Sequence, residues 1–282
     1  MATTADSTID AVRTSLNYSL PNPTGSELYF NQPRPELTTS INNNLNHDSR
    51  DVMIHNLRGR EQFFTLDENG FQYVKQETTA NFTDKAAIVA DYYQEIREFL
   101  KQQTGGHQVF IVGHRVRGSE SLEEYKPLPA DRTVGRPPAL VVHCDRTLDS
   151  VIEAVRRHMG EQAETLLKGR VRFVNVWRPI DQVVSRDPLG VADWQTCDTS
   201  DLIQTRIDYT NLSFNAYVSQ FNPKNTWYYL KDQTPSEALL IQCSDSKAGS
   251  ASFCLHSAFH NPESPSDAPE RKSIEVNTII FG

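Results

Sequence analysis

Short apolar segments separated by turn-forming residues occupy most of this chain. From residue 108 onward, they are rich in valine, isoleucine and aromatic residues and have the length and spacing of β-strands. The predicted strands cover residues 108–116, 139–145, 171–177, 213–221, 226–230, 238–243, 252–258 and 273–281. Many short strands of this kind predict a β-sandwich or a β-barrel.

The first part of the chain is less regular. Residues 51–57, 61–66 and 71–78 also have strand patterns, and the Asn69-Gly70 dipeptide predicts a hairpin turn across 67–70. Residues 1–50 are rich in Ser, Thr, Asn and Pro and lack sustained alternation. We therefore predict a loosely structured N-terminal arm over 1–50.

Two segments have the period of a helix. Residues 84–103 carry an apolar stripe with a spacing near 3.6 residues, and Gly105-Gly106 is expected to end that helix. A second helix is predicted over 148–159. Neither shows a catalytic pattern, so both are expected to pack outside the strands. The predicted fold is mainly β with flanking helices, and residues 1–282 are taken as a single domain.

The tripeptide His143-Cys144-Asp145 is the first candidate for chemistry. In an extended strand the side chains of residues i and i+2 lie on one face, so His143 and Asp145 can bind one ion together. His256 lies on a later predicted strand. Two histidines and a carboxylate form the facial triad of non-haem Fe(II) oxygenases, which leaves positions open for a cosubstrate and dioxygen. Arg271 follows His256 in the sequence, at a position where such enzymes often have the cation that binds the distal carboxylate of 2-oxoglutarate.

Each residue of this set also has an ordinary structural interpretation. His143 could be a buried strand histidine bonded to a carbonyl group, and Asp145 could cap the predicted helix. The distal histidine is open as well, because His260 shares strand parity with His256. His260 precedes Asn261-Pro262, which favours a turn, and this favours His256 as the ligand.

Several longer motifs resemble a known family, the fungal gibberellin-desaturase-like and cephem-methoxylase-like hydroxylases and desaturases of secondary metabolism. The motifs are IHNLRG (54–59), LDENGF (66–71), HCDRT (143–147), NVWRPI (175–180), WYY (227–229), HSAF (256–259) and RKSIEV (271–276). The resemblance implies an Fe(II) and 2-oxoglutarate dependent oxygenase with a double-stranded β-helix (jelly-roll, cupin-like) core. It also implies that His143, Asp145 and His256 are the metal ligands.

The chain departs from the family pattern at two positions. Cys144 stands where relatives have valine between the ligands, and its side chain is expected to face away from the metal. Asn277 stands where relatives often have arginine. A role for position 277 is therefore not carried over from the family.

Cationic and aromatic residues on the predicted strands are candidates for substrate binding. Strand parity places Arg115 and Arg117 on one face, where they could bind a carboxylate through paired hydrogen bonds, although a charged strand end at the surface would look the same. Arg178 could face the same pocket or form a structural ion pair. Trp177 and Trp227 could line an apolar pocket or fill the core. The expected substrate is a small or medium carboxylate-bearing metabolite, to be hydroxylated, desaturated or closed into a ring.

Composition narrows the function further. A net charge of −8 argues against nucleic-acid binding, and no apolar stretch is long enough to span a membrane. The four cysteines show no CxxC spacing, which favours free thiols and a cytoplasmic protein. Two other classes remain open. One is a cupin-like zinc-dependent hydrolase or isomerase, in which Arg271 would be structural. The other is a non-catalytic β-sandwich binding module.

Overall fold

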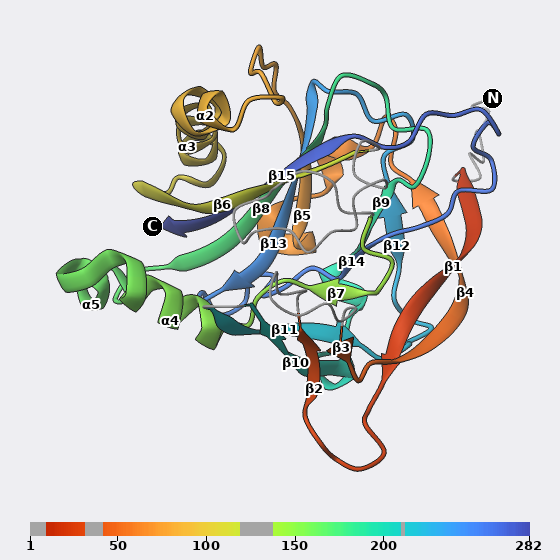
Figure 1. The fold of residues 1–282 in the computed structure, drawn as a ribbon, viewed down its shortest axis with the longest axis horizontal. Helices are drawn as coiled ribbons and strands as arrows, with labels where there is room; N and C mark the ends of the chain where they lie inside the picture. The colour runs from red at the N-terminus through yellow and green to blue at the C-terminus, as the bar shows by residue number, and fades with distance from the viewer. Residues whose placement is uncertain (1–9, 32–41, 119–137, 210–211) are drawn as a thin grey trace, which may run out of the picture.

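Two β-sheets pack face to face in the computed structural model, which describes residues 10–31, 42–118, 138–209 and 212–282 (Figure 1). Within these ranges the larger sheet has ten strands and the smaller has five. The larger sheet contains, in spatial order, β1 (Ala11–Leu20), β4 (Asn46–Asn56), β12 (Trp227–Tyr229), β9 (Leu189–Ala192), β14 (His256–Ala258), β7 (His143–Cys144), β11 (Ser213–Ser219), β10 (Leu202–Asp208), β2 (Leu28–Asn31) and β3 (Asn42–Asn43).

The smaller sheet forms a layer that is covered on both faces. Its strands, in spatial order, are β5 (Phe71–Lys75), β13 (Glu237–Asp245), β8 (Val171–Pro179), β15 (Ser273–Phe281) and β6 (Gln108–Arg117). Every residue of β8 and β13 is buried. Phe173 and Ile241 pack inward against residues of the larger sheet such as Val191. This sandwich of two curled sheets is the expected jelly-roll core, and the prediction of a mainly β fold is confirmed.

The helices lie outside the sandwich. A continuous helical segment comprises α2 (Lys85–Ala87), a π-helical turn (Ile88–Tyr92) and α3 (Tyr93–Thr104), and it covers the outer face of the smaller sheet. Gly105, with φ at 70°, ends α3 as predicted. The other helix expected from sequence is α4 (Leu148–Met159), which is followed by α5 (Ala163–Leu166). No helix among the described residues is long and apolar enough to cross a membrane.

The packing of α3 shows why its sequence forms a helix there. Ile96 and Leu100 are fully buried and lie in one apolar cluster with Val174 and Val176, which come from the outer face of β8. Spacing of four residues puts Ile96 and Leu100 on the same side of the helix. Burial of this stripe therefore fixes the helix on the smaller sheet.

The prediction of a loosely structured arm over 1–50 is wrong for its described residues. β1 pairs antiparallel with β4 along its whole length, from Ala11 opposite His55 to Leu20 opposite Asn46. Val12, Leu16 and Tyr18 alternate inward and are almost completely buried. The polar Thr14 occupies the same parity and breaks the apolar alternation, which hid the strand in the sequence.

The predicted strand at 61–66 and the hairpin across 67–70 are also wrong. The chain forms a short 3-10 helix, Glu61–Phe63, and then one helical turn, α1 (Leu66–Asn69). The Thr65 hydroxyl caps this turn by accepting a hydrogen bond from the Glu68 amide at 3.3 Å. Gly70 ends it with φ at 82°, and a Cβ there would lie 2.8 Å from the Phe253 carbonyl oxygen. Asn69-Gly70 is thus a helix C-terminus.

Among the described residues beyond the N-terminal 50, two further strands were not predicted, β9 and β10. Residues of β9 are fully buried and include Gly190, which weakens the strand pattern in the sequence. β10 is half exposed and carries polar residues on its outer face. Short 3-10 helices at Trp194–Thr196 and Thr199–Asp201 lie between the two, and a third at Gly160–Gln162 joins α4 to α5.

Candidate metal and cosubstrate site

The candidate site lies at the centre of the larger sheet, where β7 is held between β14 and β11. His143 on β7 is directly opposite His256 on β14 and opposite Val218 on β11. The Cys144 side chain points the other way, into the core, and its thiol donates to the Cys243 carbonyl at 3.2 Å. Burial of Cys144 on one face therefore turns His143 and Asp145 to the other face, as strand parity predicts.

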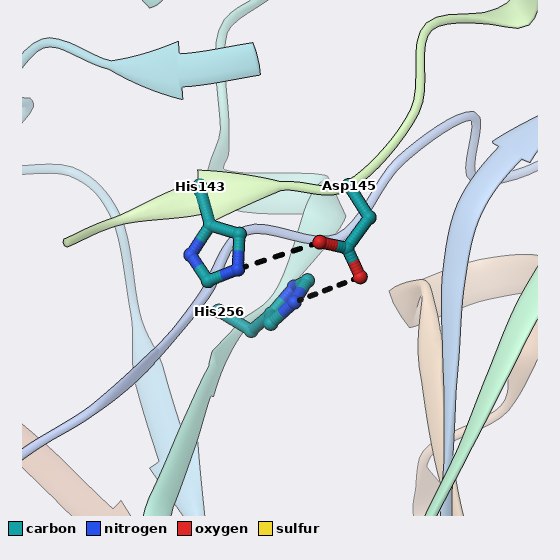
Figure 2. A group of neighbouring side chains, drawn as sticks. All are labelled: His143, Asp145 and His256. Carbon is teal, nitrogen blue, oxygen red and sulfur yellow. Dashed lines mark ion pairs between the residues drawn. The ribbon is translucent and has the colours of Figure 1, made fainter. Parts of the chain in front are cut away.

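Three potential ligands converge from these strands (Figure 2). His143 Nε2 lies 3.6 Å from Asp145 Oδ1, and His256 Nε2 lies 3.8 Å from Asp145 Oδ2. One ligand atom from each residue can be chosen so that all lie within 4.8 Å of one another. This spacing is suitable for a single ion bound by all three side chains.

Main-chain hydrogen bonds orient both imidazole rings. His143 Nδ1 lies 2.7 Å from the Val141 carbonyl oxygen, and His256 Nδ1 lies 3.0 Å from the Cys254 carbonyl oxygen. A carbonyl oxygen only accepts, so each Nδ1 carries the hydrogen and each Nε2 presents a lone pair to the centre. His256 Nε2 is buried and has no hydrogen-bond partner among the described residues. A buried nitrogen of this kind is normally satisfied, and a metal ion would satisfy it.

The electrostatics of the site favour the protonation states that a metal needs. Burial, and then the neighbouring His256, lowers the pKa of His143 to about 4. Burial alone would raise the pKa of Asp145, but His143, His256 and Arg115 outweigh it and lower the pKa to about 2. At neutral pH the imidazole of His143 is uncharged and the carboxylate is ionised, so both can bind a metal without first losing a proton.

Thr147 explains the local structure after the ligands. Its hydroxyl accepts from the Ser150 amide at 3.2 Å and caps α4, so Asp145 is not the helix cap. The helix begins just after the site and starts with this cap, which leaves the Asp145 carboxylate to face the two histidines.

The three ligands line a pocket that is open to solvent. Its charged walls come from β6 and β15, through Arg115, Arg117 and Glu275, and from Arg271 just before β15. Its apolar walls are Ala139, Trp177, Leu189 and Ala258. The pocket therefore joins the metal-binding atoms, three cations and an aromatic surface in one space.

Arg271 is buried at the edge of this pocket. Its Nη1 donates to the Asp187 carbonyl at 2.6 Å, its Nε has no hydrogen-bond partner among the described residues, and its Cζ lies 5.4 Å from the Trp177 ring centre. Burial, together with the nearby Arg117, lowers the pKa of Arg271 to about 9. The guanidinium still carries its charge at neutral pH and is suited to pair with a carboxylate in the pocket.

Arg115 and Arg117 both line the pocket, as their parity on the strand predicts. In the β6–β15 register Arg115 lies opposite Glu275 and Arg117 lies opposite Ser273. Arg115 Nη2 donates to the Tyr209 hydroxyl at 3.2 Å. Trp177 also lines the pocket, as predicted.

The structure does not bring Arg178 or Trp227 into the pocket, and the expectation that they contact substrate is corrected. Arg178 follows Trp177 on β8 and so points to the opposite face, where it donates to the Gln76 carbonyl at 2.9 Å and lies over the Tyr92 ring. Trp227 is fully buried in the core, and its indole donates to the Tyr18 hydroxyl at 3.0 Å. Both side chains have structural partners.

The structure also separates the two candidate distal histidines. His256 is 2% exposed and faces Asp145, whereas His260 is exposed and its carbonyl accepts from the Thr14 hydroxyl at 2.6 Å. Of the two, the geometry selects His256.

Asn175 was not identified from sequence as part of the site. It is fully buried on β8, and its side-chain amide donates to Asp145 Oδ2. The available signal was a polar residue at the centre of the strand, with two apolar residues on each side of it in the sequence. Such a residue needs a hydrogen-bond partner inside the protein.

Comparisons with known proteins agree with this site. A family profile described as "Oxidoreductase/YMDC permease-like domain" matches residues 16–281. The chain is 30% identical to the hydroxylase/desaturase efuI of Hormonema carpetanum, over 84% of this chain and 85% of the relative. It is 30% identical to the Fe(II)/2-oxoglutarate-dependent dioxygenase nvfI of Aspergillus novofumigatus, over 92% of each chain.

A solved structure of the iron and alpha-ketoglutarate-dependent endoperoxidase NvfI superposes with a TM-score of 0.85 and 29% identity. The match covers 96% of this chain and 98% of that structure. This relative therefore shares the fold as well as the sequence pattern. The comparisons support an oxygenase and do not support the zinc hydrolase or the binding module. The chain belongs to the fungal Fe(II)/2-oxoglutarate-dependent hydroxylase and desaturase family of secondary metabolism.

Proposed function

We propose that His143, Asp145 and His256 hold Fe(II) in this enzyme and that Arg271 binds the distal carboxylate of 2-oxoglutarate. The observation that carries the proposal is the buried Nε2 of His256, which has no partner among the described residues and points at Asp145 beside His143. Arg271 lines the same pocket, and its Nε has no hydrogen-bond partner in the described part of the chain. The donor set and the cation thus match the two parts of an iron–cosubstrate complex.

The iron, 2-oxoglutarate and dioxygen together supply the oxidising power for attack on an unactivated C–H bond. The protein residues supply position. His143 on β7, Asp145 just after it and His256 on β14 would hold the ion, and all three line the pocket in which the cosubstrate would bind. Trp177 lies next to the Arg271 guanidinium and limits the space around the cosubstrate. Placement of the substrate carbon in this pocket decides between hydroxylation, desaturation and ring formation.

The proposed substrate is a small or medium, mainly apolar metabolite that bears a carboxylate. The chain has a net charge of −8, so it has no general attraction for anions, and a carboxylate needs local cations. Arg115, oriented by the Tyr209 hydroxyl, and Arg117 supply them on one wall of the pocket. A guanidinium can bind a carboxylate through two parallel hydrogen bonds.

A substrate screen tests this proposal. Fungal terpenoid acids, polyketide acids and amino acids would each be compared with their methyl esters by measuring succinate release with Fe(II), 2-oxoglutarate and dioxygen. The expected result is faster turnover of the acids, lost in Arg115→Met and retained in Arg178→Met, whose side chain points away from the pocket. Equal turnover of acid and ester would contradict the proposed binding of a substrate carboxylate by Arg115 and Arg117.

The proposal also includes a single oxygenase domain and a reducing cellular compartment. The family profile spans 16–281, which supports one oxygenase domain. Cys144, Cys197, Cys243 and Cys254 are all free thiols, which supports a reducing compartment such as the cytoplasm.

A further inference from the structure

We propose that Asn175 and Asn277 form a hydrogen-bonded relay that holds the Asp145 carboxylate so that it binds the metal through Oδ1 alone. This inference rests on the proposed function, because it assigns a role toward the metal that the three ligands are proposed to bind. Asn175 and Asn277 are positioning residues, since each acts through Asp145.

The relay crosses two neighbouring strands of the smaller sheet. Asn175 on β8 lies directly opposite Asn277 on β15. Asn277 Nδ2 donates to Asn175 Oδ1 at 2.7 Å, and Asn175 Nδ2 donates to Asp145 Oδ2. Asn175 is fully buried, so its amide has no water to replace these partners.

The chemistry of the end groups fixes the direction of both amides. An ionised carboxylate only accepts hydrogen bonds, so Asn175 must turn its NH₂ group toward Asp145 and its oxygen toward Asn277. Asn277 must then present its own NH₂ group. Glu275 Oε1 lies 3.4 Å from the same Nδ2 and accepts from it, so a second carboxylate holds the far end of the relay.

The relay makes the two Asp145 oxygens inequivalent. Oδ2 accepts from Asn175 and lies 3.8 Å from His256 Nε2, whereas Oδ1 lies 3.6 Å from His143 Nε2 and accepts no hydrogen bond from the side chains that the structure describes. Coordination through one oxygen keeps more positions open for the cosubstrate and dioxygen. Without the relay the carboxylate can rotate, and loss of such a supporting hydrogen bond typically weakens metal affinity by about 10- to 100-fold.

Two substitutions break the relay in different ways. Asn175→Ala removes the donor to Asp145. Asn277→Asp is nearly isosteric but places an acceptor opposite Asn175, so the Asn175 amide must rotate and present its oxygen to Asp145. Each variant is expected to raise the Kd for Mn(II), measured without 2-oxoglutarate, by about tenfold or more.

Thr278→Val is the matched control. The Thr278 hydroxyl donates to the Val174 carbonyl at 2.7 Å, so this variant also loses one buried hydrogen bond between β15 and β8. Thr278 shares strand parity with Val276 and Ile280, so its side chain lies on the face of β15 opposite to that of Asn277. It is expected to lower the Tm and leave the Kd for Mn(II) unchanged. The inference is overturned if Asn277→Asp changes that Kd no more than Thr278→Val does.

A crystal structure of the Mn(II)-loaded wild type supplies a readout of coordination. It is expected to show Asp145 bound through Oδ1 alone, and coordination through both oxygens would also overturn the relay. Failure of the wild type to bind Mn(II) at all would instead overturn the proposed function, and this inference with it.

Discussion

The two histidines of the site are fixed by the main chain before any metal binds. Their Nδ1 atoms bond to the Val141 and Cys254 carbonyls, each two residues earlier in the sequence. The strand geometry that places each ring also selects the tautomer that presents Nε2 to the ion. Removal of either ring is therefore expected to lower metal affinity.

His256→Ala is expected to abolish both Fe(II) binding and turnover, because it removes one of three ligands from a buried centre. His260→Ala is the control. Its side chain is exposed, and the only hydrogen bond described for this residue uses its carbonyl, which alanine retains. Retained activity in His256→Ala with loss in His260→Ala would reverse the assignment.

Arg271→Ala is expected to raise the KM for 2-oxoglutarate by tens-fold or more, since losing one partner of a desolvated charge pair costs on the order of 2–5 kcal/mol. Arg178→Ala, which removes a buried arginine from the opposite face of the sheet, should lower the Tm without this change in KM. Steady-state kinetics with varied 2-oxoglutarate measures both. An unchanged KM in Arg271→Ala would exclude it from cosubstrate binding.

The alternation of side chains along a strand predicted which residues share a face. It correctly placed His143 with Asp145 and Arg115 with Arg117. It did not predict which face of β8 meets the pocket. Trp177 and Arg178 are adjacent in the sequence, and only three-dimensional packing shows that Arg178 lies against Tyr92 of the π-helical turn whereas Trp177 lines the pocket.

At the element scale, a network of ion pairs holds α1 against the smaller sheet. Arg170 donates to both Asp67 on α1 and Asp245 on β13, and Arg172 also pairs with Asp67. The Asp245 side chain is 0% exposed. A buried carboxylate of this kind needs its cation to remain ionised.

Arg170→Ala is expected to lower the free energy of unfolding by on the order of 3 kcal/mol, because the buried Asp245 loses its nearer cation and keeps Arg172 at 3.6 Å and the Lys247 amide. Arg156→Ala breaks the exposed pair with Glu164 and should cause no measurable loss. Urea denaturation of the two variants makes the comparison. Equal free energies of unfolding in the two variants would show that the ion-pair network does not stabilise α1 against the smaller sheet.

Strand β1 pairs with β4, and a buried hydrogen bond from the Trp227 indole to the Tyr18 hydroxyl also links it to β12. Tyr18→Phe is expected to cost about 1–3 kcal/mol of unfolding free energy, because the buried indole N–H loses its acceptor. Tyr229→Phe is the control, since the Tyr229 hydroxyl is buried and unpaired among the described residues. A Tyr18→Phe variant as stable as Tyr229→Phe would contradict this role.

Elements with a strong period were predicted well and those with mixed patterns were not. The helix at Leu148–Met159 and the strand at Ser273–Phe281 have the predicted bounds, because each has a continuous apolar pattern. β1 was missed because Thr14 interrupts its buried face. The turn at Asn69-Gly70 was misassigned because a left-handed glycine ends a helix as readily as it forms a hairpin.

At the scale of the whole molecule, the sandwich explains how ligands far apart in the sequence meet. β7 and β14 are neighbours in the larger sheet, whereas β6, which carries Arg115 and Arg117, and β15, which Arg271 precedes, belong to the smaller one. The pocket lies between the two sheets and needs both. The strand pattern predicted a sandwich or a barrel, but the order of strands within each sheet depends on long-range pairing that no local pattern contains.

The central claim is that this pocket binds Fe(II) and 2-oxoglutarate together, and an anaerobic titration tests it most directly. Fe(II) added to the protein with 2-oxoglutarate, in the absence of oxygen, is expected to produce a weak visible charge-transfer band that saturates at one iron per chain. The band should be absent in Asp145→Ala and present in Thr278→Val. A wild-type protein that binds zinc tightly and gives no band with Fe(II) and 2-oxoglutarate would contradict the account.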